Sequence, residues 1–561
     1  MSSVSNLSGP VEVKVARDVS QVLNRALEET PDKVALITRS GSVTYAELDA
    51  LANQAARALR ELGVKSGDRV AACLPNDIDI LVAFHGTMRL GAIWVGVTKA
   101  LAAPEQAYIL NDSGASLALF DPETAAQMRA EQPSLPELRA IVSVGTPDEP
   151  ASPISWKALT EKQETTPLDV EIDPLAPAAI AYTSGTTGYP KGAVHSHIGL
   201  LLPGAYLVAT RRYDADLRKG DAFPLTILNM IVLTTLTTSQ ALGTAIIMDS
   251  LSARGVAAWI RDERVTVWNG PPPVLYTMAH DEQIQPSDLA TMREVWSGGA
   301  DLPDAIREAF EAKFPARIYG TYGLTEAPTC VTLETLDEPH VAGSSGRVLP
   351  HLEVTIRDSD GVELPLGAVG EICVGVRHQS QIAERFREDW GVETAGELPP
   401  YVPMLSYWNK AQQSEAAMSG GVMHTGDAGS LDPEGNLIVS DRINLVLNRG
   451  GANVYPAEVE RVVLSFDPVD SCAVLGVPDE RLGERIGMLV QFKPGRTPDV
   501  DGLVSHCLEQ LARYKVPELV AVVESLPRNS MGKIDRRALK ELGQRQLATV
   551  ERWTEQRKES E

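Results

Sequence analysis

The chain has 561 residues, with 75 acidic side chains against 51 lysines and arginines, and its formal net charge is −24. This length exceeds what one hydrophobic core usually supports, so the sequence predicts two or more domains. The acidic balance disfavours a nucleic-acid-binding protein, because phosphate backbones attract clustered Lys and Arg. A composition of 43% hydrophobic and 22% charged residues is that of a globular protein and excludes a disordered or fibrous one.

The five cysteines lie far apart, without a CxxC pair or a histidine at zinc spacing. A disulfide framework and a structural zinc site are therefore not expected, and a reducing cytoplasm is. The N-terminus carries no apolar stretch typical of a secretory signal. Between Asp221 and Asp249 lie 27 uncharged residues, a length that reaches across a bilayer. Since they include Pro224, Asn229 and six threonines, we expect a buried helix and strand lining an interior cleft, not a membrane span.

Helices and strands alternate along the first part of the chain. Residues 44–62 read as an amphipathic helix in which Thr44 and Glu47 form a capping box, and residues 69–74 read as a buried strand. The same rhythm returns at 256–268 and 303–319. This alternation predicts α/β layers with helices covering mainly parallel strands.

The sequence pattern changes twice towards the C-terminus. Residues 354–376 form short runs broken by glycine and proline, which indicates a β-rich subdomain. Beyond Asp441 the chain has its own helices and strands, at 456–464, 471–477 and 500–514, before a polar helix candidate at 541–561. We therefore expect a large N-terminal domain over residues 1–440, a junction at 441–447, and a small α+β domain over 448–561.

The strongest motif is a loop rich in hydroxyl groups and glycine, which follows an apolar strand candidate at 178–182. It reads Tyr182-Thr183-Ser184-Gly185-Thr186-Thr187-Gly188-Tyr189-Pro190-Lys191-Gly192. Hydroxyls and closely approachable backbone N–H groups suit an anion, and Lys191 adds positive charge. The loop is not a Walker A motif, because Pro190 stands where that pattern has glycine. It predicts polyphosphate binding, and the alternative is a flexible surface loop without a binding role.

At this loop the chain resembles the adenylate-forming superfamily, which includes acyl-CoA synthetases, firefly-type luciferases and the adenylation domains of peptide synthetases. Segments similar to those of the family recur in order from about residue 43 to 539. They are Ser297-Gly298-Gly299-Ala300, Tyr322-Gly323-Leu324-Thr325-Glu326, His424-Thr425-Gly426-Asp427, Asp441-Arg442, Gly450-Gly451-Ala452-Asn453-Val454-Tyr455-Pro456-Ala457-Glu458-Val459-Glu460 and Asn529-Ser530-Met531-Gly532-Lys533-Ile534-Asp535.

The resemblance implies a role for each motif. Asp427 and Arg442 are expected to hold the ribose of ATP, and Tyr322 is expected to border adenine together with the 297–300 turn. Glu326, with Thr183, is expected to bind Mg²⁺, because a hard cation prefers oxygen ligands. The expected ATP- or AMP-binding set comprises Thr183, Ser184, Gly185, Thr186, Thr187, Gly188, Lys191, Gly298, Gly299, Ala300, Tyr322, Gly323, Thr325, Asp427 and Arg442.

The implied activity is that of an AMP-forming acyl-CoA synthetase, an acid–thiol ligase. A carboxylate attacks the α-phosphate of MgATP to give an acyl-adenylate and pyrophosphate, and the thiol of coenzyme A then displaces AMP. By resemblance, Lys533 positions carboxylate and phosphate, and Glu326 and Thr183 complete the expected catalytic set. The family turns its C-terminal domain between the steps, which places the hinge at Asn444 and brings Gly450 and Gly451 to the site.

Two alternatives stay open at this stage. One is an adenylating enzyme that delivers its acyl group to a carrier protein or an amine. The other is a nucleotide-binding regulator that has lost catalysis. The expected partners are a carboxylic acid, ATP and CoA, without nucleic acid or a membrane span, and a homodimer is left open.

The acyl site departs from the family pattern. Relatives often carry a histidine at the end of a Pro-Leu-x-His segment, where this chain has Pro224-Leu225-Thr226-Ile227. Because residues 222–248 include no charged side chain, we expect an apolar acid, whether fatty, aromatic or alicyclic. Its carboxylate end is expected near Ile227, Asn229 and Met230, with Gly298 and Gly323 completing the pocket.

An extra segment lies near residues 379–400, where the family usually has a short connection. Phe386 and Trp390 are four apart and would share one face of a short helix. We expect a structural role for this segment, such as a subunit contact.

Overall fold

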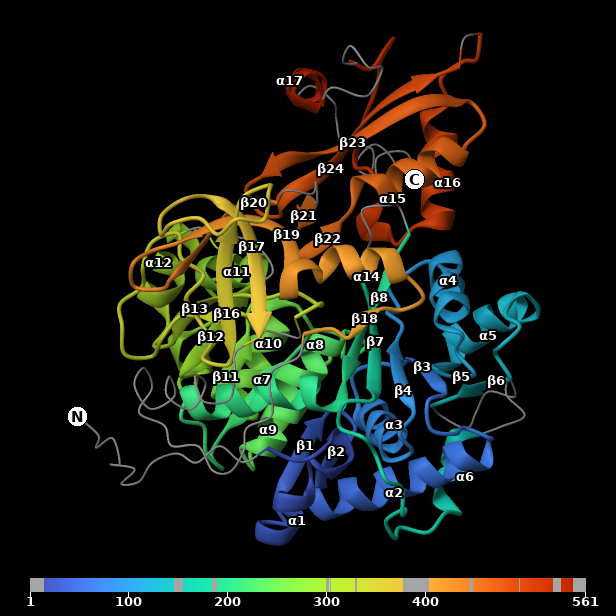
Figure 1. The fold of residues 1–561 in the computed structure, drawn as a ribbon, viewed down its shortest axis with the longest axis vertical. Helices are drawn as coiled ribbons and strands as arrows, with labels where there is room; N and C mark the ends of the chain where they lie inside the picture. Colours follow the sequence, from blue (N-terminus) through green and yellow to red (C-terminus); the bar gives the residue numbers. More distant parts are fainter. Residues whose placement is uncertain are drawn as a thin grey trace.

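The computed structural model of the protein describes residues 15–145, 155–183, 189–298, 302, 304–327, 330–376, 403–442, 447–493, 495–527 and 536–547. They form a large N-terminal domain of α/β layers and a smaller C-terminal domain, drawn in orange and red at one end of the long axis (Figure 1). The expected fold class, mixed α/β with two domains of unequal size, is confirmed.

Two mainly parallel sheets build the N-terminal domain. The first has the order β18-β8-β7-β4-β3-β5-β6 in the described chain, with β7, β8 and β18 antiparallel at one edge. Its strands are β3 (Arg69–Cys73), β4 (Ile93–Gly96), β5 (Leu117–Phe120), β6 (Ala140–Ser143), β7 (Pro177–Thr183), β8 (Lys191–Ser196) and β18 (Ser406–Tyr407).

The second sheet has the order β15-β14-β13-β12-β11-β9-β10-β1-β2 among the described strands and is parallel from β13 to β1. Its strands are β1 (Val34–Thr38), β2 (Gly41–Thr44), β9 (Arg218–Asp221), β10 (Thr244–Ile247), β11 (Val267–Asn269), β12 (Glu294–Gly298), β13 (Arg317–Tyr322), β14 (Thr332–Leu333) and β15 (Arg347–Val348). Parallel strands end at a common edge, so motifs that follow different strands meet there.

Helices cover both sheets, as the alternation of the sequence predicts. In α2 (Tyr45–Glu61) the capping box forms, because Glu47 N donates to Thr44 Oγ1 and Thr44 N donates to Glu47 Oε2. Gly63 follows the helix with φ +85°, a conformation that glycine adopts without penalty. The other helices and helical turns are η1 (Val19–Gln21), α1 (Asn24–Glu29), α3 (Ile78–Arg89), α4 (Ala103–Ser113), α5 (Pro122–Glu131), η2 (Gln132–Ser134), α6 (Trp156–Glu161), α7 (His197–Thr210), α8 (Leu228–Met230), η3 (Ile231–Leu236), α9 (Thr237–Gln240), α10 (Ala253–Asp262), α11 (Pro272–His280), η4 (Pro286–Leu289), α12 (Asp304–Lys313), α14 (Ala411–Ala417) and η5 (Ser419–Gly421).

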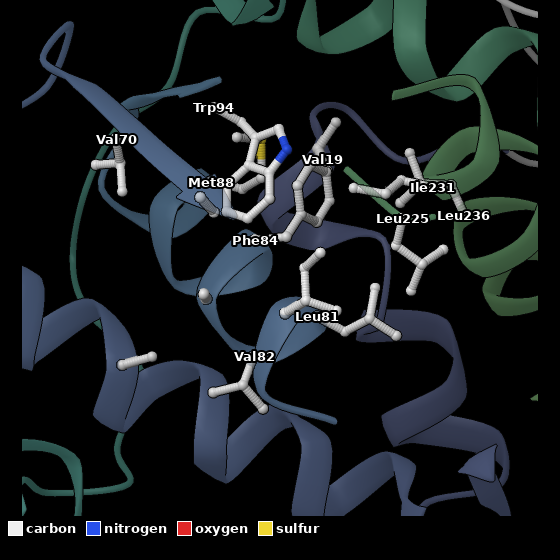
Figure 2. Packing of buried hydrophobic residues seen from close by; sticks show 14 of the residues in the cluster. Val19, Val70, Leu81, Val82, Phe84, Met88, Trp94, Leu225, Ile231 and Leu236 are labelled. Atoms are coloured by element: carbon white, nitrogen blue, oxygen red, sulfur yellow. The ribbon is translucent and has the colours of Figure 1, made fainter. Parts of the chain in front are cut away.

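The uncharged stretch between Asp221 and Asp249 is mostly buried, as predicted, and Ile227 is its exposed residue. It forms α8, the π-helical turn η3, α9 and strand β10. Leu225, Ile231 and Leu236 pack into the same core as Phe84 of α3 and Trp94 of β4 (Figure 2). The rings of Phe84 and Trp94 meet edge to face with centroids 5.5 Å apart. In the described part of the chain, no helix combines the length and the apolar character needed to cross a bilayer.

The β-rich subdomain expected at 354–376 is an antiparallel sheet of β16 (Leu352–Arg357), β17 (Gly370–Val376), β19 (Val422–Leu431) and β20 (Leu437–Arg442). The C-terminal domain has its own sheet and core. It comprises β21 (Leu447–Arg449), β22 (Ala452–Val454), α15 (Pro456–Ser465), β23 (Val469–Asp479), β24 (Gly483–Phe492), α16 (Val500–Gln510), η6 (Arg513–Lys515), β25 (Leu519–Val522) and α17 (Arg536–Leu547).

Candidate active site

The predicted phosphate loop connects the ends of two paired strands. Thr183, the last residue of β7, lies opposite Lys191, the first residue of β8. The loop between them is thereby fixed at both ends at the edge of the first sheet. Its residues Ser184, Gly185, Thr186, Thr187 and Gly188 lie outside the described residues.

Glu326 meets this loop although 143 positions separate it from Thr183. Thr183 Oγ1 donates to Glu326 Oε1 at 3.3 Å, and Tyr407 OH donates to the same oxygen at 2.8 Å. Lys191 Nζ lies over the Tyr407 ring, 4.7 Å from its centroid. Burial lowers the pKa of Lys191, and the Glu326 carboxylate opposes that shift. Burial and the same carboxylate raise the pKa of Tyr407, so its hydroxyl remains a donor at neutral pH.

Thr183 and Glu326 fit a magnesium ion. Both offer oxygen atoms, the ligands that this hard cation prefers. Neighbouring ligands of an octahedral Mg²⁺ with bonds of about 2.1 Å lie about 3.0 Å apart. The measured separation of 3.3 Å between Thr183 Oγ1 and Glu326 Oε1 is close to this spacing.

A second pair forms where the second sheet meets the β-rich subdomain. Tyr322, at the end of β13, donates its hydroxyl to Asp427 Oδ2 on β19 at 2.7 Å. Asp427 is buried, and Arg442 of β20 lies opposite it in the antiparallel register. The residues expected to bind ribose are therefore cross-strand neighbours, and Tyr322 connects them to the edge that carries Gly298.

Glu371 supports the turn that presents Asp427, and sequence inspection missed it. Its Oε1 accepts from Gly426 N at 3.0 Å, and its Oε2 contacts His424 Nδ1 at 2.8 Å. Gly426 has φ +71°, which a side chain would strain. Donor atoms of Glu371, Cys373 and His424 lie within 4.8 Å of one another. Tyr407 was also missed as a site residue, because its contact with Glu326 depends on the pairing of β18 with β8.

The remaining motif residues lie at the carboxyl ends of β12 and β13. Gly298 ends β12 opposite Thr321, where an added Cβ would stand 2.6 Å from Thr321 O, so only glycine fits. Gly323 and Thr325 are half-buried in the turn that leads to Glu326. Gly299 and Ala300 lie outside the described residues.

The predicted acyl segment lies between the two large sheets. Ile227 is 39% exposed, whereas Met230 is half-buried and packs against both large core clusters. Asn229 Oδ1 is buried, and the described part of the chain offers it no hydrogen-bond partner. Thr226 O approaches Gly96 at the end of β4 so closely that a Cβ there would stand 1.9 Å away. Backbone contact at Gly96 thus fixes the loop before α8.

The glycine pair predicted for the CoA step reaches the N-terminal domain. Gly450 and Gly451 form the turn between β21 and β22, with φ +62° and +91°. An added Cβ on Gly451 would lie 4.0 Å from Pro271, and one on Gly450 would lie 3.9 Å from Pro273. Both prolines follow β11, so this hairpin lies at the strand edge that carries the site. Asn444, Lys533 and the extra segment with Phe386 and Trp390 lie outside the described residues.

Comparison with known proteins identifies the family. The family described as AMP-binding enzyme matches residues 23–381, and that described as AMP-binding enzyme C-terminal domain matches residues 458–533. A long-chain-fatty-acid–CoA ligase of Mycobacterium tuberculosis is 32% identical over 535 residues, which cover 94% of this chain and 98% of the relative. A methyl-dioxo-octahydroindenyl propanoyl:CoA ligase of the same species is 32% identical over 547 residues, which cover 94% and 99%.

Solved structures agree with this assignment. The amide bond synthetase McbA of Marinactinospora thermotolerans superposes with a TM-score of 0.79 and 28% identity, over 93% of this chain and 99% of that one. The expected AMP-forming acid–thiol ligase is confirmed by these relatives together with the family match. The two matched regions and these relatives thus place this chain in the AMP-binding enzyme family of adenylate-forming acyl-CoA ligases.

Proposed function

We propose that the protein activates a largely apolar carboxylic acid with MgATP and transfers the acyl group to coenzyme A. One observation carries this proposal: Thr183, at the end of β7, donates to Glu326, and Tyr322, four residues before Glu326, donates to Asp427. The turn at residues 322–326 thereby links the first sheet, which carries Lys191, to the expected ribose site on β19. In the first step a carboxylate oxygen bonds to the α-phosphorus and pyrophosphate leaves. In the second, the CoA sulfur bonds to the acyl carbon, AMP leaves, and the thiol proton goes to solvent.

The residues act mainly by positioning and charge neutralisation, since displacement at phosphorus needs no protein nucleophile. Asp427 and Arg442 orient the ribose, and Lys191 with the loop hydroxyls neutralises the phosphates. Lys533 relieves the repulsion between the incoming carboxylate and the α-phosphate. Thr183 and Glu326 would hold Mg²⁺, which when bound would supply charge neutralisation at the phosphates.

The domain limits proposed from the sequence complete this account. A hinge at residues 441–447, with Asn444 at its centre, lets residues 448–561 turn against residues 1–440 between the two steps. The position of Gly451 close to Pro271 supports an arrangement suited to the CoA step.

Measuring pyrophosphate release tests the proposal. A panel of carboxylic acids is supplied with MgATP, with and without CoA, and the acyl products are identified by mass spectrometry. We expect turnover that requires an acid, together with a thioester only when CoA is present. Absence of pyrophosphate release with every acid would overturn the proposed function.

The same assay addresses transfer to an amine or a carrier protein instead of CoA. The similarity to an amide bond synthetase over nearly the whole chain motivates this second candidate. Amide formation with added amines, combined with no thioester in the presence of CoA, would establish it over the first.

Location and assembly extend the proposal. We propose a cytoplasmic enzyme, which the five buried free thiols support, because an oxidising compartment favours disulfides. A homodimer remains a prediction that light scattering after size-exclusion chromatography measures.

A further inference from the structure

Strand β9 carries two charged residues into the interior of the second sheet. Lys219 and Asp221 are both 0% exposed. They are two residues apart and share one face of the strand. The intervening Gly220 faces the other side, where an added Cβ would meet Met248 and Val265. Lys219 and Asp221 therefore face the helices that follow Ile227, as the bond from Thr234 of η3 to Asp221 confirms.

The Asp221 carboxylate is fully supplied with donors. Its Oδ2 accepts from Thr234 Oγ1 at 2.9 Å and from Asn269 Nδ2, and its Oδ1 accepts from Phe223 N at 3.0 Å. A buried carboxylate with three donors is satisfied and has little need of a further partner.

The Lys219 ammonium is not satisfied to the same degree. Its Nζ donates to Asn269 Oδ1 at 3.1 Å and lies 4.5 Å from the centroid of the Trp296 ring. Asn269 Oδ1 is its sole hydrogen-bond acceptor among the residues that the structure describes. An ammonium has three donors, and leaving donors unpaired in an apolar interior is costly. Burial lowers the pKa of Lys219 to about 8, because the apolar surroundings disfavour the charged form.

Lys219 contacts residues that neighbour the proposed acyl site in the sheet. Trp296, whose ring it covers, stands two residues before Gly298 on β12 and therefore about 7 Å further into the sheet. Asn269 lies opposite Trp296 in the neighbouring strand. Thr234, bonded to Asp221, lies one helical turn beyond Met230 of the predicted acyl segment.

We propose that Lys219 determines acyl specificity by donating a hydrogen bond to a neutral oxygen acceptor, such as a keto group, on the distal part of the substrate. The inference rests on the proposed function, because it assumes that the carboxylate of an acid binds near Gly298. The proposal requires that an acid of medium length reaches from there to Lys219 with its carbonyl oxygen. This carbonyl oxygen gives the ammonium of Lys219 a second hydrogen-bond acceptor. The rest of the acyl chain contacts the apolar cluster around Leu233 and Tyr322.

The charge balance around Lys219 selects a neutral acceptor over a second carboxylate. The Asp221 charge raises the pKa of Lys219 against the effect of burial and so offsets its positive charge, and the neighbouring Arg211 and Glu294 form a buried ion pair of their own. A dicarboxylic acid would add an uncompensated negative charge to this interior, which costs more than its contact with Lys219 returns.

The test compares oxo acids with unsubstituted acids of the same length. Acids of six to nine carbons are assayed by pyrophosphate release, each beside the analogue that carries a ketone next to its terminal methyl group. We expect the wild-type protein to favour the best oxo acid in kcat/KM by about tenfold to a hundredfold, the scale of one hydrogen bond from a charged donor. Lys219→Met, of similar length without the charge, should abolish or reverse this preference while retaining activity with unsubstituted acids.

Lys65→Met is the matched control, because Lys65 is exposed and distant in sequence from the site motifs. It should leave the preference unchanged. The wild-type comparison alone decides the case should Lys219→Met fail to fold. Equal use of both acids, a preference for the unsubstituted acid, or a preference for dicarboxylates would each overturn the inference. Because these outcomes still require pyrophosphate release, they are distinct from failure of the proposed function.

Discussion

Tyr407 connects two oppositely charged groups of the site. Its hydroxyl donates to Glu326, and its ring lies beneath Lys191. Tyr407→Phe removes the donor and retains the ring, so Glu326 loses one of its two restraints. We expect the KM for MgATP to rise about tenfold, the scale of one hydrogen bond to a carboxylate, with a smaller change in kcat. Steady-state pyrophosphate release at varied MgATP measures the effect.

Tyr276→Phe is the control for that substitution, because the hydroxyl of Tyr276 belongs to a ring that is 38% exposed on α11. It should leave both constants unchanged. An unaltered KM in a folded Tyr407→Phe protein would show that Thr183 alone orients Glu326.

Substitution of Lys533 tests the adenylation step separately from thioester formation. Negative charge passes through the α-phosphate while an anionic carboxylate approaches, so a bridging cation acts where repulsion peaks. Lys533→Ala should slow acyl-adenylate formation by at least ~10²–10³-fold, the usual scale for one preorganised electrostatic contact. With preformed acyl-adenylate and CoA, the variant should make thioester at close to the wild-type rate. Parallel loss in both half-reactions of a folded variant would remove Lys533 from the adenylation role.

Single residues differ in how far the sequence identifies them. Thr183 stands in a loop whose composition marks it, whereas Glu326, Tyr322 and Asp427 are identified by the resemblance to the family. The fold pairs Thr183 with Glu326 and Tyr322 with Asp427. Tyr407 is marked by no local pattern, because its contact with Glu326 depends on the pairing of β18 with β8. Lys219 is missed for a related reason: the uncharged stretch begins just after Asp221, and the sequence does not tell that β9 is buried on both faces.

The last residue of β4, Gly96, lies directly against the backbone of the loop before α8. Gly96 ends β4, and a Cβ added there would stand 1.9 Å from Thr226 O, closer than any real contact. Gly96→Ala should therefore push the 224–227 loop away from β4 and displace Asn229 and Met230. We expect kcat/KM for the acid to fall at least ~10-fold, because misplacing a substrate-positioning segment by about 1 Å is costly. The KM for MgATP should change less.

Gly375→Ala provides the comparison, since its Cβ would meet nothing closer than 3.6 Å. Activity and melting temperature should both stay near those of the wild type. Equal use of the acid by the Gly96→Ala and wild-type proteins would separate the 224–227 loop from the acyl site.

Elements with local signals are the ones that the sequence predicts well. Helix α2 has an apolar stripe, a capping box and a glycine stop, and all three appear in the fold. Strands β14, β15 and β18 have two residues each, too few to show the alternation of apolar and polar residues that predicts a strand. The π-helical turn η3 escapes prediction as well, because Ile231–Leu236 carries the composition of any buried helix.

The two domains are joined by a buried ionic cluster that crosses their boundary. Lys515 Nζ lies 2.6 Å from Glu105 Oε1 on α4 and 2.8 Å from Glu458 Oε1 on α15. Ala512 N also donates to Glu105 Oε2. The three charged side chains are at most 6% exposed. Burial alone would lower the pKa of Lys515, but Glu458 and Glu105 raise it above its usual value.

This cluster fixes the domain arrangement that brings Gly451 to Pro271. The residues come from sites some 400 positions apart, so no local pattern predicts their contact. Arg461 of the C-terminal domain adds a second contact, with its guanidinium 4.3 Å from the ring centroid of Tyr189 beside the phosphate loop. The proposed turn of the domain for adenylation would separate these groups, so the strength of their contacts would set the balance between the two arrangements.

Glu105→Gln should therefore impair thioester formation, whereas Lys533→Ala should impair adenylation. Glutamine keeps the cap of α4, because its amide oxygen still accepts from Ala102 N, but it leaves Lys515 with one carboxylate in place of two. Breaking one side of a buried charge cluster weakens the contact by a few kcal/mol. We expect thioester formation from preformed acyl-adenylate to slow at least ~10-fold, while pyrophosphate release in the first turnover keeps its rate or rises. Glu137→Gln, at an exposed position, should change neither step. A uniform loss in both half-reactions would mean that Glu105 supports α4 alone, whereas opposite effects in Glu105→Gln and Lys533→Ala require two domain arrangements with one step in each.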